Sequence, residues 1–168
     1  MIKILKSIVL PGLFLVLSLA SCLNVDTVEY TAAKEQQELS TYLQNLAGKG
    51  FNIDTTAMGV YYIRMTEGTG PFPVAGDTIS IKYVGYLLNG NVFDTSFYTS
   101  SDSSWTYVYK QKELLAAWDE ITGMMNTNCK MEFIIPSALA YGSLGAGSIP
   151  PYSPLVFVAI MSKIKTKN

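Results

Sequence analysis

The chain has 168 residues, of which 49% are hydrophobic and 15% charged, a composition typical of one packed domain with a short appendage. Its formal net charge is −1 and no segment is strongly basic, which argues against binding to nucleic acid. Histidine is absent, so the commonest general base and the commonest metal ligand are both excluded. The carboxylates show no ligand spacing, and we expect neither a metal nor a cofactor. Conformational catalysis on a bound peptide needs no proton transfer and is compatible with this composition.

Residues 1–21 have the pattern of an export signal, which is excluded from the fold. Lys3 and Lys6 precede a mostly apolar run, residues 8–20, that is shorter than the roughly 20 residues of a membrane-spanning helix. The run ends in Leu19-Ala20-Ser21-Cys22, where small residues precede a cysteine. A simple secretory signal with an incidental cysteine is the alternative interpretation.

The same segment resembles a bacterial lipoprotein signal, with the four residues that end in Cys22 as its lipobox. The resemblance implies cleavage before Cys22, lipidation of Cys22 and a tether over residues 22–30. Leu23 and Asn24 include no aspartate of the kind that retains lipoproteins in the inner membrane. We therefore expect a lipid-anchored protein of the bacterial cell envelope, on the outer membrane and facing the periplasm. Acylation of Cys22 would leave Cys129 without a disulfide partner, and its alternating segment predicts a small buried hydrophobic residue.

Residues 31–58 are predicted to form an N-terminal helical segment. Thr31 is a favourable N-cap residue, Gly48 marks an end, and four apolar residues recur between them at helical spacing, namely Leu39, Tyr42, Leu43 and Leu46. A single narrow apolar stripe on a short helix favours packing against the rest of the chain. Pairing with a second copy of the helix, which would give a weak homodimer, is the alternative.

Residues 59–168 form the predicted main domain and carry mostly strand signals. Alternating or β-branched and aromatic residues occur over residues 59–65, 79–84, 105–109, 131–135 and 155–164. Asn89-Gly90 predicts a two-residue hairpin turn, and one helical pattern runs from Glu113 to Met124. The loop over residues 136–152 is long enough to indicate a functional role. We predict an α+β fold, with an antiparallel twisted sheet wrapped on one short α-helix and preceded by the N-terminal helix.

Six aromatic residues and one carboxylate are concentrated in this domain: Tyr83, Phe93, Trp105, Trp118, Tyr141, Phe157 and Asp94. Aromatic side chains with few polar groups are typical of an apolar ligand pocket, and equally of an ordinary core. Taken alone, Trp118 is better interpreted as a core residue and Asp94 as a cap of the turn after its strand.

The order of the motifs favours the pocket, because residues 76–163 resemble a peptidyl-prolyl isomerase domain of the FKBP family. Five elements occur in the family's order: Tyr83-Val84-Gly85-Tyr86-Leu87 through Phe93-Asp94-Thr95-Ser96, the helix from Glu113 to Glu120, Ala140-Tyr141-Gly142, Ile149-Pro150-Pro151 and Leu155-Val156-Phe157. The resemblance implies an FKBP-like fold and an isomerase that acts on proline-containing polypeptides, here exported proteins.

The resemblance also implies which residues form the site. Trp118 would be the floor under the substrate's proline ring, in a pocket lined by Tyr83, Phe93, Trp105, Leu114, Leu115, Trp118, Tyr141, Ile149 and Phe157. In the family, the backbone N–H at the position of Leu115 and the hydroxyl of Tyr141 donate hydrogen bonds to bound carbonyls. Asp94 polarises the rim of the pocket near the twisting amide.

The chain departs from the family pattern at two loops and one strand. Residues 97–104 contain no arginine to pair with Asp94, which leaves Thr95, Ser96 or a tyrosine hydroxyl to hold it. The loop before Pro150 is one residue shorter than in many relatives, and Trp105 stands where phenylalanine is usual. A non-catalytic FKBP-fold module that binds extended chains as a chaperone is therefore the alternative function.

Overall fold

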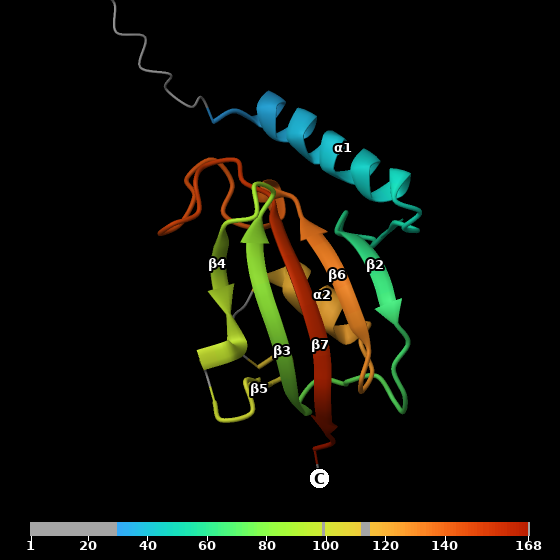
Figure 1. Cartoon of the computed structure of the whole chain (residues 1–168). Helices are drawn as coiled ribbons and strands as arrows, with labels where there is room; N and C mark the ends of the chain where they lie inside the picture. The colour runs from blue at the N-terminus through green and yellow to red at the C-terminus, as the bar shows by residue number, and fades with distance from the viewer. Residues whose placement is uncertain (1–29, 99, 112–114, 168) are drawn as a thin grey trace, which may run out of the picture.

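The structure is a computed structural model that describes residues 30–98, 100–111 and 115–167. The strands are β1 (Asp54–Thr55), β2 (Tyr61–Thr66), β3 (Thr78–Leu87), β4 (Val92–Thr95), β5 (Trp105–Val108), β6 (Lys130–Ile135) and β7 (Leu155–Lys165). The helices are α1 (Ala32–Gly48) and α2 (Ala116–Gly123), with short 3₁₀ turns η1 (Ser96–Tyr98) and η2 (Ser137–Leu139). All strand pairs are antiparallel, in the order β1-β2-β6-β7-β3-β4 with β5 also paired to β3 (Figure 1). The predicted α+β fold is confirmed.

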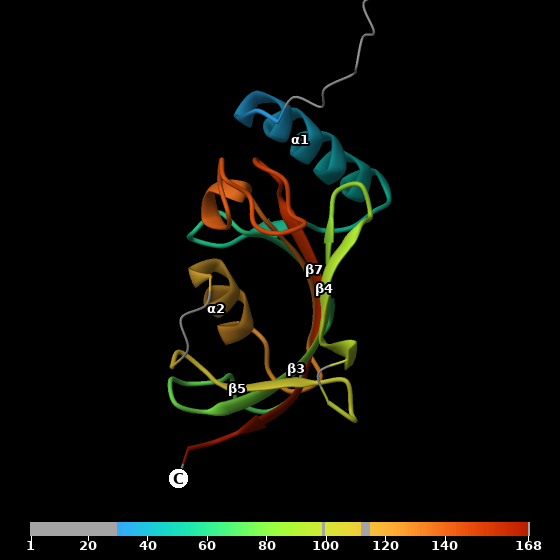
Figure 2. The same cartoon turned by 90° about the vertical axis from the view of Figure 1, so that its left-hand side faces the viewer.

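The centre of the sheet is the long β3–β7 pair, whose register runs from Thr78 opposite Lys165 to Leu87 opposite Leu155. Side chains on a strand point alternately to the two faces. On β3, Ile79 and Ile81 are fully buried in the main core on one face of the sheet. Figure 2 shows the sheet curved around α2, which covers this face.

Helix α2 begins later than its sequence pattern predicts. The pattern starts at Glu113, but Leu115 has an extended ψ of 127° and serves as the N-cap, while residues 112–114 lie outside the described part of the chain. The carbonyl of Leu115 accepts hydrogen bonds from the backbone N–H groups of Trp118 (2.9 Å) and Asp119 (3.2 Å). The first helical turn therefore starts at Ala116, and Trp118 lies within it.

The hairpin between β3 and β4 is present, but its predicted two-residue turn is wrong. The N–H of Leu87 donates to the carbonyl of Asn91 (2.9 Å) and the N–H of Gly90 to the carbonyl of Leu87 (2.8 Å), so the loop holds three residues, 88–90. Only Gly90 has positive φ there (88°), as in a type I turn followed by a left-handed glycine. Asn89 needs no strained conformation in this arrangement.

Helix α1 packs against the opposite face of the sheet, as predicted. The Thr31 side chain accepts a hydrogen bond from the Lys34 N–H (3.2 Å) and caps the helix. Its buried side chains join a second core cluster with buried residues of β2, β6 and β7: Leu39, Leu46, Ile63, Ile134 and Val156. The apolar stripe of α1 therefore packs against the sheet. Pairing of α1 with a second copy of itself stays a prediction.

The segment between α1 and Gly59 contributes β1, which pairs with β2. The boundary between residues 31–58 and 59–168 stays a prediction. In the part of the chain that the structure describes, no helix has the length and apolarity needed to cross a bilayer.

Cys129 is a small buried residue, as its alternating segment predicts. Its side chain is 0% exposed, and Arg64 Nη1 donates to its Sγ at 3.0 Å. Burial raises the pKa of this thiol above its ordinary value. Cys129 is therefore a packing residue whose sulfur stays protonated at neutral pH.

Gly85 lets two phenyl rings lie directly on the backbone of β3. A Cβ at this position would come within 2.7 Å of Phe157 Cε1 and 2.8 Å of Phe93 Cζ. These rings also pack edge to face on each other, with centroids 5.4 Å apart. A side chain at position 85 would therefore displace both rings.

We expect Gly85→Ala to lower the free energy of unfolding by about 1–3 kcal/mol, because an extra methyl in a packed region forces its neighbours off their rotamers. Urea unfolding followed by tryptophan fluorescence measures this effect. Gly48→Ala is the matched control, since nothing lies within 4 Å of its added Cβ. Equal stability of the two variants would contradict the role of Gly85.

Tyr42 joins α1 to the sheet, because its hydroxyl donates to Glu132 Oε1 of β6 at 2.9 Å. We expect Tyr42→Phe to lower the free energy of unfolding by about 1 kcal/mol through loss of this hydrogen bond. The measurement is urea unfolding, with Tyr30→Phe as the control because the Tyr30 side chain is exposed. A Tyr42→Phe midpoint equal to the wild type would show that the bond adds no stability.

Candidate functional site

A cluster of aromatic rings surrounds Trp118 on the face of the sheet that α2 covers. The Trp118 side chain is 5% exposed. Its ring centroid lies 5.0–6.1 Å from four others, those of Tyr83, Trp105, Phe133 and Phe157. We call these five residues the aromatic cluster. Three of the four contacts are edge to face, the arrangement that ring quadrupoles favour.

The register of the strands brings these rings together. Phe133 of β6 is directly opposite Phe157 of β7, and their rings stack with centroids 5.3 Å apart. Trp105 of β5 is opposite Ile81 of β3, two residues before Tyr83 and on the same face. Tyr83 and Trp105 meet edge to face at 6.0 Å. Four strands and one helix therefore build the cluster.

Tyr107 holds the indole of Trp118 and was missed in the sequence analysis. Trp118 Nε1 donates to the Tyr107 hydroxyl at 2.8 Å, and Trp105 stacks on the Tyr107 ring at 4.4 Å. Burial raises the pKa of Tyr107 to about 12, so its hydroxyl is neutral at pH 7. The available sequence signal was its position two residues after Trp105 in an alternating segment.

Asp94 is exposed at the edge of the cluster and is held by two hydrogen bonds. Its Oδ2 accepts from the Tyr83 hydroxyl at 2.9 Å, and its Oδ1 accepts from the backbone N–H of Thr95 at 2.7 Å. The described partners of the Ser96 hydroxyl are backbone groups: its Oγ accepts from the Tyr83 N–H at 2.9 Å and donates to the Ser103 carbonyl at 2.7 Å. A tyrosine hydroxyl and a backbone N–H thus orient the carboxylate.

Burial raises the pKa of Tyr83 above its ordinary value, and the hydrogen bond to Asp94 raises it further. The hydroxyl therefore stays protonated and able to donate at neutral pH. Because the same side chain packs against Trp118, the position of the Asp94 carboxylate is tied to the aromatic cluster.

The other predicted site residues differ in how far they are buried. Ile149 is buried in the same core, and Phe93 and Leu115 are half-buried against it. Leu114 and Cys22 lie outside the described residues. The roles predicted for all of these residues stay predictions.

Among the residues that the structure describes, Tyr141 makes no ring contact with the aromatic cluster. Its side chain is 40% exposed, whereas the preceding Leu139 and Ala140 pack against the core. Among the described residues, no hydrogen bond involves the Tyr141 hydroxyl, which leaves this group able to donate to a bound molecule.

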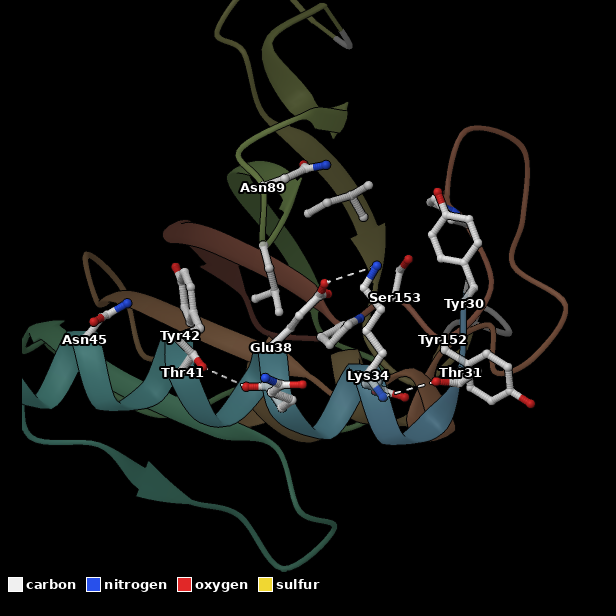
Figure 3. A pocket seen from close by; sticks show the side chains of 16 residues that line it. Tyr30, Thr31, Lys34, Glu38, Thr41, Tyr42, Asn45, Asn89, Tyr152 and Ser153 are labelled. Atoms are coloured by element: carbon white, nitrogen blue, oxygen red, sulfur yellow. Dashed lines mark hydrogen bonds and ion pairs between the residues drawn. The ribbon is translucent and has the colours of Figure 1, made fainter. Parts of the chain in front are cut away.

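A separate hollow of about 680 Å³ lies between α1 and the loops at residues 87–89 and 150–154. Figure 3 shows Lys34, Glu38 and Tyr42 of α1 on one side and Tyr152 and Ser153 on the other, with a 3.8 Å ion pair between Lys34 and Glu38. None of the five cluster residues lines it. An apolar ring bound there would have to desolvate the charged groups of Lys34, Glu35 and Glu38, so the aromatic cluster is the better candidate.

Comparison with known proteins identifies the family of the chain. A sequence profile of the FKBP-type peptidyl-prolyl cis-trans isomerases matches residues 70–160, more than half of the chain. The FKBP-type 22 kDa peptidyl-prolyl cis-trans isomerase of Escherichia coli K12 is 34% identical over 117 residues, which cover 69% of this chain and 54% of the relative. The macrophage infectivity potentiator of Trypanosoma cruzi is 30% identical over 160 residues, covering 89% and 79%.

A solved structure gives the same result. The peptidyl-prolyl cis-trans isomerase of Pseudomonas syringae superposes with a TM-score of 0.66 at 30% identity, over 83% of this chain and 99% of that one. The chain spans about half the length of the first curated relatives or less. Profile, relatives and structure agree that the chain belongs to the FKBP-type peptidyl-prolyl cis-trans isomerase family.

Proposed function

We propose that the domain accelerates cis-trans isomerisation of X–Pro bonds in exported polypeptides. The observation that carries the proposal is Trp118, an indole fixed by Tyr107 and enclosed by aromatic rings in a chain of the isomerase family. Such a site offers an apolar surface for a proline ring without any group that must transfer a proton.

The energetics of the reaction suit this site. The X–Pro bond isomerises over a barrier of about 18–20 kcal/mol, because amide resonance is lost in the twisted state. Shortening a step of tens of seconds to milliseconds, roughly 10⁴-fold, needs about 5.4 kcal/mol. Burial of one proline ring and one or two hydrogen bonds supply energy of this order. An apolar surrounding favours the twisted amide because it is less polar than the planar one.

Three groups outside the cluster have proposed roles in this reaction. The Tyr141 hydroxyl and the Leu115 N–H donate hydrogen bonds to carbonyls of the bound chain. The Asp94 carboxylate, oriented by Tyr83, polarises the rim next to the twisting amide.

The full chain is expected to accelerate the proline-limited refolding of a test protein, and Tyr83→Phe is expected to reduce kcat/KM about fivefold. The substitution keeps the ring but removes the hydrogen bond to Asp94, a loss of about 1 kcal/mol. Tyr86→Phe is the matched control, because Tyr86 packs with α1 on the other face of β3. Equal kcat/KM for the two variants would argue against a role for the Tyr83–Asp94 pair.

The refolding assay, together with an aggregation assay, distinguishes the isomerase from the chaperone module. Without acceleration at concentrations where a known FKBP is active, the isomerase proposal fails. Suppression of aggregation that survives Tyr141→Phe and Asp94→Leu would then favour the chaperone.

We also propose that Cys22 is lipidated and anchors the protein to the outer membrane of a bacterial envelope, facing the periplasm. The support is the charged, apolar and small-residue pattern of residues 1–22. A single cysteine at the start of the mature chain would place the domain on a short tether, residues 22–30.

We expect the precursor with Cys22→Ser to move from the membrane fraction to the soluble fraction of the envelope. Mass spectrometry of the wild-type N-terminal peptide should show an acylated Cys22. Cys129→Ser is the control, because Cys129 is buried in the domain. An unmodified Cys22 in membrane-bound protein would rule out the lipid anchor.

A further inference from the structure

A carboxylate of α1 binds the loop that carries Tyr141. Glu35 lies in the first turn of α1, and both of its oxygens contact Ser137, which is 102 positions further along the chain. The Ser137 N–H donates to Oε1 at 2.7 Å and its hydroxyl donates to Oε2 at 2.5 Å. Ser137 is 2% exposed, so these charge-assisted hydrogen bonds are largely shielded from water.

Ser137 in turn fixes both neighbours of Tyr141. Its carbonyl accepts hydrogen bonds from the N–H groups of Ala140 (2.9 Å) and Gly142 (2.8 Å). The backbone on each side of Tyr141 is therefore bound to the Ser137 carbonyl oxygen. Ser137 is in turn bound to Glu35.

The loop does not supply this anchor from its own residues. Ser137 is the first residue of η2, whose N-cap is Pro136 and has no side-chain cap. The first N–H groups of a helical turn lack partners within it and need a capping acceptor. Glu35, from a distant helix, is that acceptor.

Helix α1 is held firmly enough to act as a support. Leu39 and Leu46 are buried against the sheet, and the Tyr42 hydroxyl binds Glu132. The position of Glu35 is thus set by the outer face of the sheet, whereas Leu139 and Ala140, which precede Tyr141, pack against the core of the inner face. Glu35 also lies outside residues 70–160, where the family profile matches.

We propose that Glu35 is a positioning residue of the isomerase: by anchoring Ser137 it fixes the segment 140–142 and with it the Tyr141 hydroxyl. The effect on rate rests on the proposed function. The effect on the loop does not, and it can be measured separately.

The experiment compares Glu35→Ala with Glu38→Ala in the full chain. Glu38 is the matched control, one turn along α1: its carboxylate pairs with Lys34 at 3.8 Å and, among the described residues, makes no hydrogen bond to the loop that carries Tyr141. For Glu35→Ala we expect amide hydrogen exchange at Ala140 and Gly142 to accelerate about tenfold, from the loss of charge-assisted hydrogen bonds. We expect a fall of similar size in kcat/KM, and unchanged exchange at Phe133 of β6.

Glu35→Gln provides a rescue test, because its amide oxygen can still accept from the Ser137 N–H. We expect it to recover most of the exchange protection and activity. Unchanged exchange at Ala140 and Gly142 in Glu35→Ala would overturn the proposal, as would an equal rise at Phe133, which would mean general destabilisation. Accelerated loop exchange with normal kcat/KM in an active enzyme would overturn the positioning role. A wild-type protein without isomerase activity would refute the proposed function, and the exchange data would still decide whether Glu35 anchors the loop.

Discussion

The buried indole of Trp118 must have a partner for its N–H, and the surrounding structure depends on how that requirement is met. An unpaired N–H in an apolar core would cost about 1–3 kcal/mol. Tyr107 accepts this hydrogen at 2.8 Å, and Thr122 Oγ1 donates to the Trp118 carbonyl at 2.9 Å. The indole is thereby fixed at its ring and at its backbone. The rings that pack edge to face on the indole are therefore also held in place, and the cluster forms a surface of fixed shape.

The strand pair β6–β7 connects this cluster to α1. Phe133 and Phe157 face each other on the inner side of the sheet, and the next pair, Ile134 and Val156, faces α1 on the outer side. Because successive side chains on a strand point to opposite faces, one stretch of backbone supports both layers. A helix that looks like an appendage in the sequence is therefore packed directly behind the candidate site. The bond from Glu35 to Ser137 adds a second connection, just beyond the end of β6.

Local patterns were sufficient for most elements of the fold and insufficient for the contacts between them. Alternation predicted β3, β6 and β7, and the Thr31 cap is present because capping involves residues only three apart. The start of α2 was misplaced because Leu115 is apolar and fits the helical period, although its backbone is extended. Periodicity does not specify the register of β5 against β3. That register determines which residue accepts the hydrogen bond from the Trp118 indole N–H. The Glu35–Ser137 contact joins residues that share no local pattern at all.

The family resemblance located the aromatic residues, but only the structure shows which groups orient Asp94. An arginine beside Asp94 would add a charge and a rigid fork of donors. Tyr83 supplies one neutral donor, and it does so from inside the cluster, since its ring also meets Trp118 at 5.2 Å. Its raised pKa keeps the hydroxyl protonated well above neutral pH. The polar rim and the apolar floor are therefore parts of one packed unit. The same Tyr83 side chain thus both packs against Trp118 and orients the Asp94 carboxylate.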